Sequence, residues 1–285
     1  MDDMPKTLVF FATYNEAGNV AQLLASIAEF APNSDVLVVD DNSPDRTVEI
    51  MRSMEMQRLV TLVRKEKLGL GTAHILAISY AQFHGYDVLV TMDGDMSHDP
   101  SYLPAMFAGI NEGADVVIGS RYMRGGSCDY TGYRRYVSKL GNVGARWLLG
   151  IKLHEFTTSF RAFRMSSMSR INRGNLLVGG YSFFMMMIAE AASRGLCIKE
   201  IPIHFRERGY GVSKIPPLEI FRGIANLGRL AIRRVVSARP GELFSSPTKP
   251  CVICGNAYSF IEIGEVKSAD RASVAGVCVF CGSSA

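Results

Sequence analysis

The segment that decides the fold is Asp87-Val-Leu-Val-Thr-Met-Asp93-Gly-Asp95-Met-Ser97-His98. Its residues 88–92 are an apolar run, the pattern of a strand that is buried on both faces of a parallel sheet. The run ends in two acids that are separated by one glycine. Because residues two apart on an extended chain point the same way, Asp93 and Asp95 can present their carboxylates to one point.

Two interpretations of this strand end are open. Ligands of open α/β sheets bind outside the carboxyl ends of the strands, and two hard oxygen ligands there suit Mg²⁺ or Mn²⁺ on a substrate diphosphate. Gly94 would let such a ligand approach the backbone. The alternative is a turn with a helix cap, because Asp99 precedes Pro100 as an N-cap precedes a first-turn proline. Both can hold, since Asp99 can cap while the earlier acids bind.

Other apolar runs predict further strands of the sheet. They lie at residues 7–12, 35–39, 59–63 and 114–118, and segments with helical patterns separate them. This alternation predicts βαβ units and a parallel sheet flanked by helices. One helix is predicted to start with Ser43 as its N-cap and Pro44 at its first position. Polar clusters follow the runs, so we expect them to gather at one edge of the sheet, where a nucleotide would lie.

Composition limits the class of protein. The chain has 285 residues, of which 48% are hydrophobic and 20% are charged, as is ordinary for a globular protein. Its net charge of +4 favours anionic partners such as nucleotides or anionic lipid, and we do not expect nucleic acid. We recognise neither a signal peptide nor an apolar span of membrane length. The sequence therefore predicts a cytoplasmic protein, soluble or peripheral on a membrane.

Residues 218–236 predict an amphipathic helix with a basic polar face. The polar positions that recur every three or four residues are Glu219, Arg222, Asn226, Arg229 and Arg233. Such a helix can lie in a membrane interface with its arginines near anionic headgroups. It can equally pack on its own domain with a solvated basic face. The sequence leaves these two interpretations open.

The C-terminal cysteines predict a metal site. Cys251 and Cys254 form one C-x-x-C pair, Cys278 and Cys281 form a second, and 23 residues separate the pairs (278 − 254 − 1). This spacing is typical of a closed structural zinc site; free or disulfide-bonded thiols are the alternative. A module of this size cannot fold on apolar burial alone, so zinc would supply stability. It could act as a clip or dock a protein partner.

These boundaries divide the chain as follows. We expect a catalytic domain at residues 1–238, which includes the amphipathic segment at 215–237. A linker rich in proline, glycine and serine follows at 239–249, and a small zinc-ribbon-like module occupies 250–285.

Taken together, the motifs resemble those of family 2 glycosyltransferases of the GT-A fold, which have a Rossmann-like, mostly parallel sheet. The resemblance is to dolichol-phosphate mannosyltransferases and polyprenyl-phosphate glycosyltransferases, and it excludes the zinc module. The motifs are Ala12-Thr-Tyr-Asn-Glu16, Val39-Asp-Asp-Asn-Ser-Pro-Asp-Arg-Thr47, Lys67-Leu-Gly-Leu-Gly71, Met92-Asp-Gly-Asp-Met-Ser-His98, Gly119-Ser-Arg121, Arg134-Arg-Tyr-Val-Ser138, Thr157-Thr-Ser-Phe-Arg161 and Arg208-Gly-Tyr-Gly-Val-Ser-Lys214.

The resemblance implies roles for residues at matching positions. Asp93 and Asp95 should bind the donor and its Mg²⁺ or Mn²⁺, with Gly94 between them. Arg208 and Lys214 should hold the donor diphosphate. The residues implied to hold the nucleoside are Ala12, Tyr14, Glu16, Val39 and Asp41. The residues implied to hold the acceptor phosphate are Arg121, Arg134 and Ser138.

The implied reaction is transfer of a sugar, mannose or glucose first, from a GDP- or UDP-sugar to a polyprenyl or dolichyl phosphate at the cytoplasmic face of a membrane. A single in-line displacement would invert the anomeric carbon, and an anionic phosphate acceptor needs no strong general base. One alternative is transfer to a soluble or protein hydroxyl, which would need a base near Asp95. Another is an inactive scaffold whose zinc module binds a partner; the intact acidic pair disfavours it.

The sequence departs from the family pattern at several positions. Ala12 stands where the family usually has proline, and Arg46 stands where it has glycine. Phe184 and Met186 occupy positions that are often polar or acidic, in a region near the acceptor. The identity of the acceptor is therefore left open.

Overall fold

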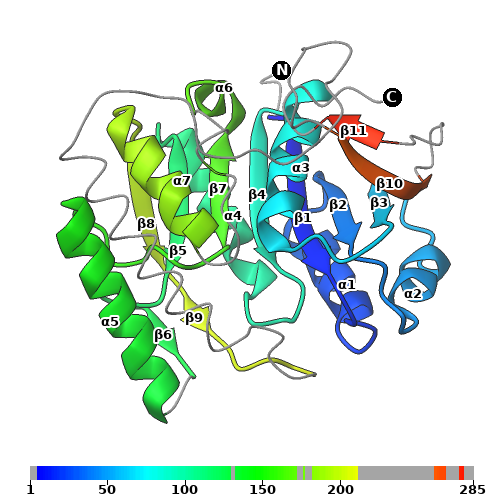
Figure 1. Cartoon of the computed structure of the whole chain (residues 1–285), viewed down its shortest axis with the longest axis horizontal. Coiled ribbons are helices and arrows are strands. Elements are labelled where there is room, and N and C mark those ends of the chain that lie inside the picture. Colours follow the sequence, from blue (N-terminus) through cyan, green and yellow to red (C-terminus); the bar gives the residue numbers. More distant parts are fainter. Residues whose placement is uncertain are drawn as a thin grey trace.

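The computed structural model describes residues 5–129, 132–171, 176, 182–210, 260–267 and 276–278. Within these ranges the chain forms a nine-stranded sheet with the order β11-β10-β3-β2-β1-β4-β7-β5-β8, and a two-stranded ribbon of β6 and β9 (Figure 1). The strands are β1 (Thr7–Thr13), β2 (Asp35–Asp40), β3 (Leu59–Arg64), β4 (Val88–Asp93), β5 (Val116–Ser120), β6 (Ser127–Cys128), β7 (Arg161–Arg164), β8 (Ile198–Pro202), β9 (His204–Phe205), β10 (Phe260–Lys267) and β11 (Gly276–Cys278).

The predicted parallel sheet is confirmed, with one inserted antiparallel strand at its centre. Strands β3, β2, β1 and β4 pair in parallel, and so do β5 and β8. Between these groups lies β7, which pairs antiparallel with both β4 and β5. The residues before β7 therefore arrive at the carboxyl ends of β4 and β5, beside the acidic pair.

Helices cover both faces of the sheet. They are α1 (Val20–Phe30), α2 (Thr47–Ser53), α3 (Leu70–Phe83), the 3-10 turn η1 (Pro100–Tyr102), α4 (Leu103–Asn111), α5 (Gly132–Leu149), α6 (Met165–Met168) and α7 (Ser182–Ser193). The helices are divided between the two faces of the sheet, as strand β1 shows. Leu8 and Phe10 pack with α3 and α7 on one face, and Val9 and Phe11 pack with α1 and α4 on the other. Burial on both faces explains why the central strands are continuous apolar runs.

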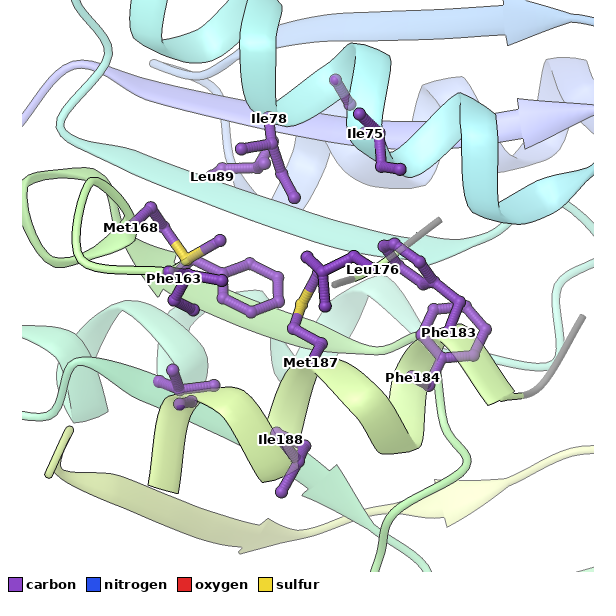
Figure 2. Close-up of a cluster of buried hydrophobic side chains, with 14 of the residues drawn as sticks. Ile75, Ile78, Leu89, Phe163, Met168, Leu176, Phe183, Phe184, Met187 and Ile188 are labelled. Carbon is purple, nitrogen blue, oxygen red and sulfur yellow. The ribbon is translucent and has the colours of Figure 1, made fainter. Parts of the chain in front are cut away.

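The core on the α3 and α7 side is rich in Phe and Met. Figure 2 shows Ile75 and Ile78 of α3 facing Phe163 of β7 and the side chains of α7, among them Phe183 and Met187. Long unbranched methionines fill the space between the aromatic rings. This packing fixes α7 against the sheet on the side of the molecule that also carries α5.

Two helix starts were predicted, and one of them is wrong. Helix α2 begins at Thr47 and not after Ser43, because the Ser43 hydroxyl donates to Asp40 Oδ2 at 2.6 Å and stays in the loop. Asp45 Oδ1 accepts instead from the Thr47 amide at 3.1 Å. The Asp99 cap is confirmed: its side chain accepts from the Ser101 amide at 2.9 Å, and Pro100 opens the turn.

The C-terminal segment adds two strands to the sheet. Strand β10 pairs antiparallel with β3, and β11 pairs with β10 so that Cys278 lies opposite Phe260. The predicted helix at 218–236, the linker at 239–249 and three predicted zinc ligands, Cys251, Cys254 and Cys281, lie outside the described residues. The zinc site and the domain division therefore stay predictions. No helix in the described part of the chain is long and apolar enough to cross a membrane.

Candidate active site

Three predicted donor residues lie in one row across the carboxyl edge of the sheet. Ala12 of β1 is paired with Val39 of β2 on one side and with Asp93 of β4 on the other. Asp41, the residue directly after β2, donates its amide to the Thr13 carbonyl at 3.0 Å. The row runs from the predicted nucleoside side to the predicted metal side, so the parallel register places the residues of three motifs side by side.

Asp93 ends β4 with its carboxylate partly exposed. Its side chain is 31% exposed, and Oδ1 accepts from the Ser159 hydroxyl at 2.5 Å. Ser159 comes from the loop before the antiparallel strand β7, 66 residues further along the chain. The loop thus fixes the orientation of Asp93 while leaving part of the carboxylate accessible.

Asp95 is buried and has a partner at each oxygen. Oδ1 accepts from the Ser97 hydroxyl at 2.5 Å and from the Ser97 amide at 3.1 Å. Oδ2 lies 3.0 Å from Arg208 Nε, and the Gly209 amide donates to the Asp95 carbonyl at 3.3 Å. Arg208, predicted to hold the donor diphosphate, is therefore brought directly to a predicted metal ligand.

Gly94 has a packing role that the sequence interpretation did not give it. A Cβ at this position would lie 2.9 Å from the Ala12 carbonyl oxygen of β1. The missing side chain therefore allows the two strand ends to approach each other, and not only a ligand to approach the backbone. Two residues later, Met96 has φ 66°, a left-handed conformation that is rare for a residue with a side chain. Such outliers concentrate at functional sites.

His98 packs against the segment that carries Asp93 and Asp95, and it was not predicted as a site residue. Its Nδ1 accepts from the Asp93 amide at 3.0 Å, so the proton of the neutral ring lies on Nε2, which is 3.2 Å from Thr158 Oγ1. Burial lowers the pKa of His98. The ring stacks on Phe160 with centroids 5.0 Å apart. A neutral, buried ring with both nitrogens engaged is a structural support.

The predicted nucleoside side contains an ion pair that the sequence did not reveal. Asp41 forms an ion pair with Arg64, which is fully buried at the end of β3. Arg64 also donates to the Gly69 carbonyl at 3.1 Å, and the Gly69 amide donates to Asp41 Oδ2 at 3.3 Å. Burial raises the pKa of Asp41, and the attraction of Arg64 opposes this effect. The pair holds the start of α3 against the end of β2.

Tyr14 lies at the same edge and carries a cation over its ring. Lys67 Nζ is 4.3 Å from the centroid of the Tyr14 ring, which is half-buried. Glu16, by contrast, is buried, and its Oε2 accepts from Asn19 Nδ2 at 2.7 Å. Tyr14 is half-buried at this edge of the sheet, whereas the Glu16 carboxylate bonds to Asn19 at the start of α1.

Arg121 is locked into a buried ion pair at the end of β5. Its Nε and Nη2 donate to the two carboxylate oxygens of Glu155 at 2.8 and 3.1 Å, and Nη2 also donates to Thr157 Oγ1 at 3.0 Å. The adjacent Glu155 raises the pKa of Arg121 against the opposing effect of burial, and Arg121 lowers the pKa of Glu155. Both groups are therefore charged near neutral pH.

Ser138 on α5 lies in the neighbourhood of Arg121. Tyr122 packs against Arg121, with its ring centroid 5.3 Å from the guanidinium carbon. Burial raises the pKa of Tyr122, while Arg121 and the Ser138 hydroxyl both act to lower it. Arg134 begins the same helix, but its side chain and the whole of Lys214 lie outside the described residues.

The carboxylates at the end of β4 suit a divalent cation that is also bound by a substrate. Within the described residues no group of three or more His, Cys, Asp or Glu side chains gathers at one point. Two carboxylates at a strand end, with phosphate oxygens and water completing the shell, are the way in which Mg²⁺ is usually held in nucleotide enzymes. Asp93 and Asp95 fit this set, and Arg208 marks the side from which an anion would approach.

An open, mostly parallel sheet with an acidic pair at the end of a central strand defines the class of GT-A nucleotide-sugar transferases. The chain belongs to glycosyl transferase family 2, whose family model matches residues 8–171. It is therefore a glycosyltransferase.

Two bacterial relatives span most of the chain. A polyprenol monophosphomannose synthase of Mycolicibacterium smegmatis is 35% identical over 232 residues, which cover 80% of this chain and 88% of the relative. An undecaprenyl-phosphate mannosyltransferase of Micrococcus luteus is 36% identical over 227 residues, or 79% of this chain and 93% of the relative. Both names describe transfer of mannose to a polyprenyl phosphate.

The fold is also shared with a solved structure of low sequence identity. Glucosyl-3-phosphoglycerate synthase of Mycobacterium tuberculosis, in complex with Mn²⁺, UDP-glucose and phosphoglyceric acid, has a TM-score of 0.58 and 18% identity, with 80% of each chain covered. This likeness confirms the predicted GT-A fold of the catalytic domain.

Proposed function

We propose that this glycosyltransferase moves mannose or glucose from a GDP- or UDP-sugar to a polyprenyl phosphate at the cytoplasmic face of a membrane, with inversion at the anomeric carbon. The observation that carries the proposal is the contact between Arg208 and Asp95 at the carboxyl end of β4. It brings a predicted diphosphate-binding cation to a predicted metal ligand. The sequence identity of 35% over 232 residues with a polyprenol monophosphomannose synthase supports a polyprenyl phosphate as the acceptor.

The donor would lie along the row from β2 to β4. Tyr14 and Asp41 offer an aromatic face and a carboxylate to the nucleoside, and Ala12 and Val39 form the floor between them. The diphosphate would then reach the end of β4, where Arg208 can bind its oxygens. A divalent cation held by Asp93 and Asp95 would supply positive charge that stabilises the departing diphosphate.

The acceptor would approach from the side of β5 and α5. The two bonds to Glu155 and the one to Thr157 occupy Nε and Nη2 of Arg121. Among the described residues none bonds the remaining nitrogen, Nη1, and we assign it to the acceptor phosphate. Because Glu155 holds the guanidinium of Arg121 in place, the Nη1 group would already be oriented before the acceptor phosphate binds. Such preorganisation favours stabilisation of a charged reactant.

The contacts at this strand end favour a phosphate acceptor over a hydroxyl. A hydroxyl would require a general base within hydrogen-bond reach. His98 is not free for this role because its Nδ1 accepts from the Asp93 amide. The nearby carboxylates Asp93 and Asp95 are assigned to the cation, and the two oxygens of Asp95 are also bonded by Ser97 and Arg208. A lipid phosphate is already anionic near neutral pH, so the residues need only bind and orient the reactants.

The proposal is tested by measuring sugar transfer from GDP-mannose and UDP-glucose with and without a short-chain polyprenyl phosphate in detergent. Asp95→Ala should lower transfer by roughly 10³-fold, because it removes a ligand that acts on the developing charge. Glu112→Ala is the matched control, since Glu112 is an exposed carboxylate that pairs with Lys199 on another element. Equal turnover by the two variants, or transfer that does not depend on the polyprenyl phosphate, would refute the proposal.

The zinc module has a separate role in the proposal. Four cysteines close the coordination shell of Zn²⁺, so the site would be structural and would stabilise the C-terminal module without entering the reaction. Such a module could also present a surface to a protein partner.

A further inference from the structure

Helix α5 carries an apolar stripe on its outer side. The side chains of Tyr136, Leu140, Val143 and Trp147 are 70%, 69%, 48% and 86% exposed. At about 100° per residue these four fall within an arc of about 60° of the helix circumference. Figure 1 shows α5 at the outer edge of the molecule, with the sheet on its other side. Large apolar side chains this exposed and this aligned mark an interaction surface.

The opposite side of α5 is the one that packs on the protein. Asn142, Ala145 and Leu149 are buried, with exposures of 3%, 0% and 2%. Asn142 fixes the helix because its Oδ1 accepts from the Phe156 amide at 2.7 Å, while its Nδ2 donates to the Ser138 carbonyl at 3.0 Å. The helix is therefore held in its rotation about its own axis, and the stripe faces away from the domain.

The charge of α5 identifies the partner. The helix contains no Asp or Glu, and Arg135, Lys139 and Arg146 are exposed along one flank of the stripe. A second copy docked through the stripe would place two basic helices in contact, and like charges disfavour this pairing. The amphipathic segment at 218–236 is also basic and would meet the same repulsion. An anionic lipid surface matches both the apolar stripe and the basic flank.

We propose that α5 docks on the surface of an anionic bilayer, with Tyr136, Leu140, Val143 and Trp147 in the acyl boundary and the basic flank against headgroups. This inference rests on the proposed function in one respect: Ser138, predicted to contact the acceptor phosphate, lies on the same helix. Docking would then bring the acceptor to within about one helix diameter, roughly 10 Å, of the residues that bind it.

The chain carries its own probe of this surface, because Trp147 is its single tryptophan. We expect the emission of the full chain to shift to the blue with vesicles that contain about one third phosphatidylglycerol, and the shift to shrink with salt. Leu140→Glu should weaken binding of the protein to the vesicles by roughly tenfold or more. Reversal of Lys139 and Arg146 to Glu should weaken it by at least roughly fivefold per residue. Phe83→Glu is the matched control, since Phe83 is a 53% exposed aromatic residue on α3.

Three outcomes would overturn the inference. The first is unchanged emission with anionic vesicles at low salt. The second is emission that depends on protein concentration without vesicles, together with a dimer mass, which would assign the stripe to a second copy. The third is equal loss of binding in Leu140→Glu and Phe83→Glu. Vesicle binding without transfer to a polyprenyl phosphate in detergent would instead refute the proposed function and leave this surface intact.

Discussion

Arg208 occupies a position on Asp95 that a divalent cation would share. Its Nε lies 3.0 Å from Oδ2, and Ser97 holds the other oxygen. A cation that approaches Asp95 would therefore meet the positive charge of Arg208 unless the guanidinium turns toward the donor diphosphate. This arrangement links cation binding to donor binding at a single carboxylate.

We accordingly expect Arg208→Ala to bind Mn²⁺ more tightly without donor, by roughly tenfold, because a nearby unit charge is removed from a partly buried site. The same variant should transfer sugar more slowly, since the diphosphate loses a cation. Titration calorimetry with Mn²⁺ alone gives the affinity. Arg206→Ala is the control, because Arg206 pairs with Asp99 at 2.6 Å and not with Asp95. Unchanged or weaker Mn²⁺ binding by Arg208→Ala would contradict this expectation.

His74 should make the protein less stable in acid. It is fully buried among Phe10, Phe183 and Phe184, and burial lowers its pKa to about 3. The unfolded chain binds a proton below its pKa of about 6.5 and the folded chain does not, so stability is fully present above that pH. It should fall by about 1.4 kcal/mol per pH unit as the pH drops from about 6.5 toward about 3.

Urea denaturation between about pH 7 and about pH 4.5 measures this dependence, because this range begins above the usual pKa of histidine, about 6.5, and extends well below it. In His74→Phe the change in the free energy of unfolding with pH should decrease by the contribution of one bound proton, about 1.4 kcal/mol per pH unit. His98, whose pKa is also lowered by burial, acts in the same direction and should leave a residual slope. Identical slopes in the variant and the wild type would show that His74 does not bind a proton on unfolding.

At the scale of the element, the active edge depends on how closely β1 and β4 approach. The two strands are paired in parallel up to Ala12 and Asp93, and a Cβ on Gly94 would lie 2.9 Å from the Ala12 carbonyl oxygen. That neighbour is backbone within a central strand, so it cannot move without moving the sheet. The glycine is therefore required by the packing of the strands.

Gly94→Ala should destabilise the protein by about 1–3 kcal/mol, the usual cost of forcing an extra methyl group into a packed interior. Gly141→Ala on α5 is a matched control, because a Cβ there meets nothing within 4 Å. In the interior of a helix this second change should stabilise by about 0.5–1 kcal/mol. Chemical denaturation of both variants gives the comparison, and changes of the same sign would count against the packing role of Gly94.

At the scale of the whole molecule, the C-terminal cysteines should hold one zinc ion per chain. The ligands would be Cys251, Cys254, Cys278 and Cys281, with a tetrahedral, closed shell. Elemental analysis of protein from metal-replete expression measures the stoichiometry. Replacement of Cys251 and Cys254 by Ser should abolish zinc binding, whereas replacement of Cys128, which lies on β6, should not. A stoichiometry near zero in the wild type would rule out the site.

Removal of the C-terminal module tests how the chain is divided. A chain that ends at residue 238 should fold, because the two cores on either side of the sheet lie within it. It should self-associate more than the full chain, since loss of β10 leaves β3 as an unpaired edge. Light scattering and thermal unfolding measure the two properties. Loss of a cooperative transition would show that the module is part of the catalytic fold.

The sequence was sufficient for the central parallel strands, the row of polar strand ends and the family, because these depend on local patterns. Buried strands must be apolar runs, and Asp93 follows such a run directly. The cap at Asp99 was predictable for the same reason. The start of α2 was not, because Ser43 bonds to Asp40 in the loop and does not cap the helix.

Only the tertiary structure decided which side chains became partners. Asp93 meets Ser159 and Asp95 meets Arg208 because β7 and the segment after β9 return to the end of β4. The distances along the chain are large, and no local pattern specifies such pairs. The apolar stripe on α5 is a second example. The spacing of its residues can be seen in the sequence, but the exposure of their side chains depends on what packs against the helix. Local chemistry fixes what a segment can form, and the topology of the sheet fixes what it contacts.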